Sequence, residues 1–305
     1  MAWAAPVHEV VASFDIPPQM PGYGALVAGG DGFHWGTTQG GGAYGNGTIY
    51  KVRTDGTDWQ TVLSFSGNST TNKGAVPYGG LVSDGAGNLW GTTNQGGAGN
   101  NGTIFKCDIA TGALTTVAEF TNTAGPCKGA NPWATLTSDG AGNLWGTTQK
   151  GGAASLGTIF KVNVATNAVT TMVEFADLAP TKGSLPCGRL IGDGAGSFWG
   201  TTYSGGANNY GTIFKINAAT GALTTLVEFT SNDVVNGGDR MKNSDATRAS
   251  RGRSAAQRVS PHTSNSAVTT LIATIPACSA DTVGPPIQMN GTSNHASSAN
   301  RYDCP

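Results

Sequence analysis

The chain has 305 residues, of which 47 are glycine and only 11% are charged, and its formal net charge is −1. This near-neutral balance argues against a nucleic-acid partner and against an anionic membrane surface, because both require a strongly basic protein surface. No apolar stretch approaches the roughly 20 residues needed to span a bilayer, so no membrane span is predicted.

A ten-residue motif recurs along the chain with a fixed period. Residues 84–93 read Asp-Gly-Ala-Gly-Asn-Leu-Trp-Gly-Thr-Thr, and the motif returns at 139–148 and, slightly altered, at 193–202. A shorter copy lies at 31–38. Successive copies of its tryptophan are 55, 55 and 54 residues apart: Trp35, Trp90, Trp145 and Trp199. A constant period of this size predicts a repeat architecture.

Taken in chain order, the sequence begins with residues 7–14, which are predicted to be the last strand of an incomplete repeat. The first nine residues have neither the basic segment nor the apolar core of a signal peptide, so none is predicted. Four full units are then predicted, at about 15–65, 66–120, 121–175 and 176–229. Residues 231–305 lose every element of the motif, and we expect a poorly ordered tail or a degenerate, truncated repeat there.

Each unit is predicted to contain four short strands, here named a to d. Runs of β-branched and aromatic residues alternate with Gly, Asn and Asp, as in strands separated by turns. In the second unit the four strands are expected at 80–83, 89–93, 102–108 and 114–120. Four-stranded sheets with two apolar faces, repeated around an axis, predict an all-β fold, a β-propeller that occupies residues 7–230.

The c–d hairpin of the second unit is predicted to turn at a short glycine-containing loop. We expect the hairpin to centre between Thr111 and Gly112. This centre would place Phe105 opposite Ala118 on one face of the sheet.

The loops of the predicted blades differ in how much they vary. Because the strands alternate in direction, the b–c and d–a loops share one face, and these loops change from unit to unit. Ligand sites usually lie on variable loops held by a rigid scaffold. The ligand-binding candidates are therefore four aromatic residues on these loops: Tyr44, Tyr78, Trp133 and Tyr210.

The repeated motif, with the following Gly-Thr-Ile-Phe-Lys and Leu-Thr-Thr-Leu-Val-Glu-Phe segments, resembles the GloVer tandem-repeat family over residues 7–229. Its shorter Asp-x-x-Gly-Asn-Leu-Trp core is similar to two-component-regulator and NHL-type propeller repeats. The resemblance implies a bacterial protein that is exported or carried on the cell surface, and it supplies no catalytic residues. The chain departs from the family in showing no signal peptide, anchor or further repeats.

Three sets of recurring residues are predicted to be structural. Asp84, Asp139 and Asp193 are expected to bond their own turns, because one such turn has too few oxygen atoms for calcium. The four motif tryptophans are expected to pack between blades rather than to bind sugar. Finally, Glu119, Glu174 and Glu228 are expected to form ion pairs with Lys106, Lys161 and Lys215 rather than a catalytic pair of acids. No catalytic residue, metal ligand or cofactor is predicted.

The leading functional hypothesis is a non-catalytic β-propeller that presents its variable loops to a glycan or protein partner outside the cell. Two alternatives stay open: a polysaccharide hydrolase or lyase that uses the central channel, and a structural spacer or truncated repeat protein without activity. Four blades could close with one strand spare, or they could form an arc of a longer propeller. The sequence predicts no particular oligomeric state.

Overall fold

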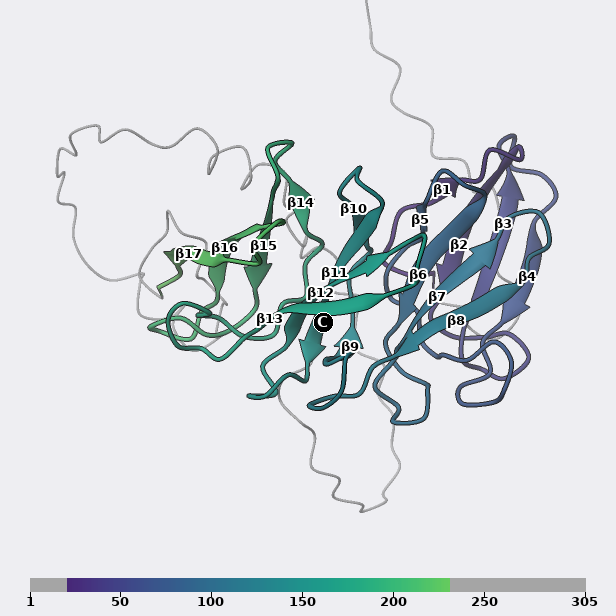
Figure 1. Cartoon of the computed structure of the whole chain (residues 1–305). Coiled ribbons are helices and arrows are strands. Elements are labelled where there is room, and N and C mark those ends of the chain that lie inside the picture. The colour runs from purple at the N-terminus through teal and green to yellow at the C-terminus, as the bar shows by residue number, and fades with distance from the viewer. Residues whose placement is uncertain (1–20, 231–305) are drawn as a thin grey trace, which may run out of the picture. The chain divides into compact units, whose positions relative to one another are not determined.

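The computed structural model describes residues 21–230 (Figure 1). In this range it contains seventeen β-strands, arranged in four antiparallel sheets, and no helix. It therefore offers no helix in these residues that could cross a membrane. The expected strand at 7–14, the start of the first unit and the tail 231–305 lie outside the described residues. The fold is all-β and built from four repeated blades, as the sequence period predicts.

The first two sheets each consist of four strands that pair in chain order. The first contains β1 (Val27–Ala28), β2 (Phe33–Thr38), β3 (Thr48–Arg53) and β4 (Gln60–Ser64). The second contains β5 (Val82–Ser83), β6 (Asn88–Thr93), β7 (Thr103–Asp108) and β8 (Leu114–Glu119). These bounds follow strands a to d as predicted, except that strand a is shorter.

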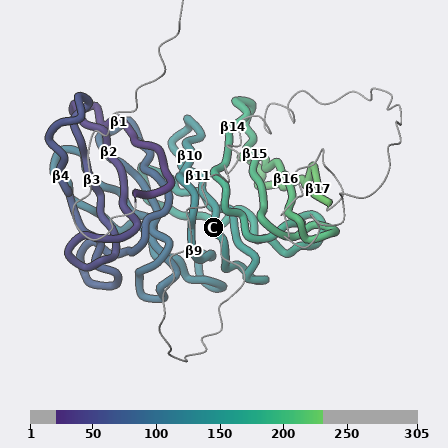
Figure 2. Tube along the Cα trace, turned by 180° about the vertical axis from the view of Figure 1, so that it is seen from behind, coloured from purple at the N-terminus to yellow at the C-terminus, as the bar shows by residue number. Residues whose placement is uncertain are grey.

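The third and fourth sheets repeat this arrangement, and Figure 2 shows many of their strands from behind. The third contains β10 (Thr137–Ser138), β11 (Asn143–Lys150), β12 (Thr158–Asn163) and β13 (Val169–Glu174), with β9 (Ala130–Pro132) paired to the end of β11. The fourth contains β14 (Ile191–Gly192), β15 (Ser197–Thr202), β16 (Thr212–Asn217) and β17 (Leu223–Glu228). Each sheet thus contains a four-stranded meander of the kind that forms a propeller blade.

The predicted register of the c–d hairpin is wrong. Phe105 lies opposite Thr116, whereas Ala118 pairs with Ile104. A β-bulge between these two pairs leaves Val117 as the extra residue on β8, and the corresponding irregularity recurs in the other three sheets. An extra residue shifts the pairing on one side of the bulge relative to the other.

Successive sheets pack face to face through the motif tryptophans. Trp90 of the second sheet is fully buried with Leu136, Leu144 and Phe160 of the third. Trp35 and Trp145 bridge the first sheet to the second and the third to the fourth in the same way. Trp199 in the fourth sheet is only partly buried. The hydrophobic core therefore lies between the sheets.

The glycine that follows each tryptophan makes room for this packing. Gly146 on β11 lies opposite Phe160 on β12. A Cβ atom at Gly146 would come within 2.5 Å of the phenylalanine Cζ and 2.7 Å of a Leu136 methyl carbon. Gly91 and Gly200 face Phe105 and Phe214 just as closely. The Trp-Gly pair is thus one packing unit. Because the glycine has no side chain, the aromatic ring of the next strand fits against its backbone.

The aspartate of the motif accepts hydrogen bonds from its own turn and from a neighbouring strand. In the second sheet, Asp84 Oδ1 accepts hydrogen bonds from the amides of Ala86 and Asn88. Its Oδ2 accepts from the Asn88 side chain and, at 2.9 Å, from the Trp90 indole. Burial raises the pKa of this carboxyl, but the hydrogen bonds outweigh burial and the net pKa is lowered. Asp139 repeats the arrangement, whereas Asp193 accepts two turn amides and Lys215.

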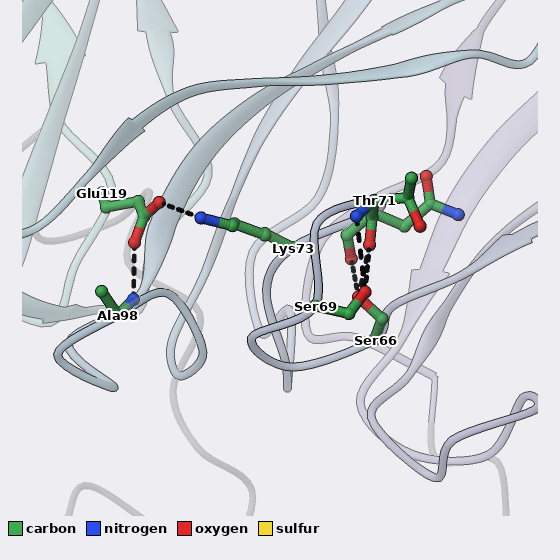
Figure 3. A network of polar contacts seen from close by, with 7 residues as sticks. Ser66, Ser69, Thr71, Lys73, Ala98 and Glu119 are labelled. Carbon is green, nitrogen blue, oxygen red and sulfur yellow. Dashed lines mark hydrogen bonds and ion pairs between the residues drawn. The ribbon is translucent and has the colours of Figure 1, made fainter.

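The recurring glutamates do form ion pairs, but the predicted lysine partners are wrong. Glu119 Oε1 contacts Lys73 Nζ at 2.7 Å, and its second oxygen accepts the Ala98 amide (Figure 3). The same pairs recur one and two periods later: Lys128–Glu174 and Lys182–Glu228. Lys106 instead extends over the ring of its cross-strand neighbour Trp90, 5.6 Å from the ring centroid. Each ion pair therefore links the loop that enters a repeat to the end of the last strand of that repeat.

These ion pairs predict a specific dependence of stability on pH. Hydrogen bonding from lysine is the main cause that lowers the pKa of each glutamate. The stabilisation is therefore complete above the pKa of an unfolded glutamate, about 4.3, and it is lost as pH falls through the lower folded-state pKa. The triple Glu119→Gln, Glu174→Gln, Glu228→Gln variant should lose about 1–2 kcal/mol of unfolding free energy at about pH 7.

Urea denaturation of the wild type and the triple variant, at about pH 7, 5 and 3, measures this effect. The variant should show a smaller fall in stability than the wild type below about pH 5. Asp58→Asn serves as control, because it removes the more exposed Arg53–Asp58 pair and should change stability by less than about 0.5 kcal/mol. An equal acid-induced loss in both proteins would contradict the role given to the glutamates.

Candidate functional site

The loops that enter strand a bring one position of all four repeats to a common place. This position is occupied by Tyr23, Tyr78, Trp133 and Cys187, each one period after the last. All four residues line a single cavity. Three of the four repeats therefore contribute an aromatic ring to the same site.

The backbone of these loops contacts the backbone of the neighbouring repeat directly. The residue two positions before the aromatic residue or cysteine has a left-handed backbone in three repeats, with φ of 54° at Val76 and 55° at both Asn131 and Leu185. The Tyr23 amide then donates to the Tyr78 carbonyl at 2.9 Å. A β-branched residue such as valine adopts this conformation only where its surroundings enforce it. The loop bonds therefore hold the rings in a defined arrangement.

Threonines fix these loops to the neighbouring sheet. The Thr37 hydroxyl, from the Gly-Thr-Thr segment of β2, donates to the Gly79 carbonyl at 3.1 Å. The Gly80 amide donates to the Thr135 hydroxyl at 2.8 Å. Each loop is thus bonded to the repeat beside it, so the position of one ring depends on the next repeat.

The three aromatic rings form a nearly parallel group. The centroids of Tyr78 and Trp133 are 4.0 Å apart with an interplanar angle of 15°. Tyr23 lies 5.9 Å from Tyr78 and 6.3 Å from Trp133, at angles of 26° and 14°. Tyr23 is 67% exposed, while the other two rings are partly buried. Tyr78 and Trp133 thus cover one face of each other, and Tyr23 is the most exposed ring of the group. We call Tyr23, Tyr78 and Trp133 the aromatic stack.

The cavity beside the aromatic stack has a volume of about 280 Å³. This lies near the lower end of the roughly 300–1,000 Å³ that is usual for small-molecule sites. Arg189 also lines it and donates from Nε to the Thr137 hydroxyl at 3.1 Å. Within residues 21–230, the lining contains no carboxylate and no histidine. The site thus combines flat apolar surface with one fixed cation.

A larger cavity of about 780 Å³ runs along β8 beside the loop at 70–73. Its charged groups, Lys73 and Glu119, already bind each other. Its walls are the edge strand of one sheet and a serine- and threonine-rich loop, whose hydroxyls also bond locally (Figure 3). The smaller cavity is the stronger candidate, because all four repeats contribute residues to its lining. Size alone does not identify a binding site.

The four aromatic candidates from the sequence fall into two groups. Tyr78 and Trp133 lie together in the cavity. Tyr44 and Tyr210 lie on b–c loops and do not line it; Tyr44 is 65% exposed and Tyr210 is partly buried. Sequence reasoning missed Tyr23, although aligning the loops at the 55-residue period would have placed it with the other two rings. It also missed Arg189, which differs in type from its counterparts in the other repeats.

The described residues contain no group of three or more histidine, cysteine, aspartate or glutamate side chains that could hold a metal ion. At the aromatic stack, the available chemistry is stacking, hydrogen bonding and one positive charge. The described residues that line the cavity include no nucleophile paired with a base.

Comparison with known proteins gives a match at the level of the family. A family model described as the Gloeobacter/Verrucomicrobia repeat matches residues 21–249. No curated protein matches the chain.

Among solved structures, the chain is similar to TolB from Acinetobacter baumannii, with 18% identity, a TM-score of 0.43, and coverage of 72% of this chain and 46% of that one. It is also similar to a chain of the nidogen/laminin complex, with 13% identity, a TM-score of 0.45 and coverage of 70% and 66%. The chain spans about half the length of the TolB structure.

Proposed function

The chain belongs to the Gloeobacter/Verrucomicrobia repeat family, and we propose that this β-propeller repeat protein binds a carbohydrate without catalysing a reaction on it. The observation that carries the proposal is the aromatic stack in a cavity to which four repeats contribute. The repeats would then act as a scaffold that sets the spacing of the binding residues. A glycan ligand agrees with the hypothesis drawn from the variable loops.

A sugar ring fits the chemistry of this cavity. The C–H groups on one face of a pyranose make an apolar surface that packs on an aromatic ring, while its hydroxyls need polar partners at the rim. Tyr23 and Tyr78 supply phenol groups, Thr135 a hydroxyl and Arg189 a guanidinium at the same cavity. A bound sugar would therefore meet both aromatic and polar groups in this cavity.

The cavity favours binding over turnover. Glycoside hydrolysis typically uses two carboxyl groups that flank the scissile bond. The described residues that line the cavity supply neither. Glu119, Glu174 and Glu228 are each engaged by a lysine and a backbone amide at the ends of strands. Export, or display on the cell surface, stays a prediction from the family resemblance; fractionation of cells producing the tagged protein would test it.

Substitutions in the aromatic stack test the proposal. Trp133→Ala removes the larger of the two closely stacked rings and should weaken binding of the best-bound oligosaccharide about tenfold, because each 1.4 kcal/mol lost corresponds to that factor. Tyr78→Ala should have a similar effect. A glycan array of neutral and acidic oligosaccharides identifies the ligand, and isothermal titration calorimetry measures its affinity.

The matched control is Tyr44→Ala, which removes an exposed aromatic side chain outside the cavity. This variant, and Tyr210→Ala, should bind like the wild type. Thermal unfolding must show that the Trp133 variant is still folded. The proposal fails if the array yields no ligand, or if the folded Trp133 and Tyr78 variants bind the identified sugar as tightly as the wild type.

A further inference from the structure

Arg189 is the one charged side chain among the described residues that line the cavity. It stands two residues after Cys187, where the other repeats have small residues: Ala25, Gly80 and Thr135. Its backbone is part of the same loop system as the aromatic stack. The positive charge is therefore a feature of one repeat, placed among groups that all the repeats contribute.

The guanidinium of Arg189 is oriented but not neutralised. Its Nε donates to the Thr137 hydroxyl at 3.1 Å, and that hydroxyl donates to the Leu190 carbonyl at 2.7 Å. These bonds fix the side chain at its Nε edge and leave the terminal nitrogens as donors. Within residues 21–230, Arg189 forms no ion pair, whereas Arg53 has Asp58 as a partner at 3.3 Å. An arginine held by a neutral partner beside a cavity has its charge available for a ligand.

From this arrangement we infer that the cavity selects a sugar ring that carries a carboxylate, a uronic acid. This inference rests on the proposed carbohydrate function. The planar guanidinium matches a carboxylate in two parallel hydrogen bonds, and charge-assisted bonds of this kind are about twice as strong as neutral ones. The aromatic stack holds the face of the ring while Arg189 holds its acid group.

A singly charged carboxylate fits better than a more highly charged group. Among the described residues, one arginine lines the cavity and no lysine does. A phosphate carries more charge at neutral pH and is commonly bound by several donors or cations at once. The absence of carboxylates from the described lining also means that an acidic ligand meets no repulsion there.

The test uses matched ligands that differ only at the carboxyl group. Uronic-acid oligosaccharides and their methyl esters share ring, linkage and length, so calorimetry on both forms isolates the contribution of the carboxylate. The wild type should bind the acid at least about tenfold more tightly than the ester. Arg189→Gln should bring the two affinities within about twofold of each other without weakening ester binding.

Two further variants sharpen the test. Arg189→Lys keeps the charge but loses the fork of donors, so it should retain only part of the preference for the acid. Arg53→Gln makes the same change of charge at an exposed arginine outside the cavity and should keep the wild-type preference.

Three other results would overturn either this inference or the proposed function. Equal binding of acid and ester by the wild type overturns this inference while the carbohydrate function stands. Tighter binding of sulfated than of carboxylated oligosaccharides also overturns it. If no oligosaccharide of either form binds, the proposed function fails, and the inference fails with it.

Discussion

Replacing Trp145 with alanine should lower the free energy of unfolding by about 3–5 kcal/mol, the range for truncating a large, fully buried aromatic side chain. Trp145 is 1% exposed and belongs to the cluster that joins the third sheet to the fourth. Its ring centroid lies 5.0 Å from that of Phe198, and its indole donates to Asp139 at 3.3 Å. The substitution removes packing from both sheets and one donor from the turn.

Trp199→Ala is the matched comparison, because this residue holds the same position in the fourth sheet but is only partly buried. Trp199→Ala should lower the free energy of unfolding by less than half as much as Trp145→Ala. Urea denaturation followed by circular dichroism measures both variants. Equal losses for the two tryptophans would contradict the assignment of the stabilisation to packing between the described sheets.

Gly146→Ala should destabilise the protein by up to about 3 kcal/mol, the upper part of the range for an overfilled core. The added methyl group would lie 2.5 Å from Phe160, whose own side chain is fully buried. The phenylalanine cannot move aside without displacing Phe120, whose centroid is 5.1 Å away. One carbon atom therefore disturbs two sheets.

The control for this substitution is Gly192→Ala on β14. A Cβ atom there would meet only Phe198, at 3.5 Å, which is an ordinary contact. Its effect should stay within about 0.5 kcal/mol. The Gly146 variant combined with Phe160→Leu should recover part of the lost stability, since the smaller side chain vacates the space. No recovery would indicate that the glycine acts through its backbone instead.

Local sequence explains which parts of the fold are predictable. The Leu-Trp-Gly-Thr-Thr and Thr-Ile-Phe-Lys segments become β6 and β7 because their residue types and bounding turns favour strands. The register of β8 could not be predicted in this way. The bulge at Val117 changes the pairing, but the pattern of apolar residues does not indicate it. Periodicity predicts the elements, but a one-residue irregularity depends on the assembled sheet.

Long-range contacts were harder to predict. Lys106 lies on the strand beside Glu119 and was therefore the natural expectation, yet Lys73, 46 residues earlier, is the partner. Two of the cavity residues, Tyr78 and Trp133, follow from the argument about variable loops. Tyr23 and Arg189 required the period to be applied to the loops as well as to the strands. The ring stack itself depends on how adjacent repeats meet, which no single repeat encodes.

The lysine–glutamate pairs have a consequence for how such a chain changes in length. Lys73 and Glu119 belong to one repeat, and so do the two corresponding pairs in the repeats that follow. A duplication or deletion of the gene segment for residues 66–120 would therefore gain or lose one pair without separating any lysine from its glutamate. Chain length could thus vary in whole repeats while every lysine–glutamate pair of this kind stays intact.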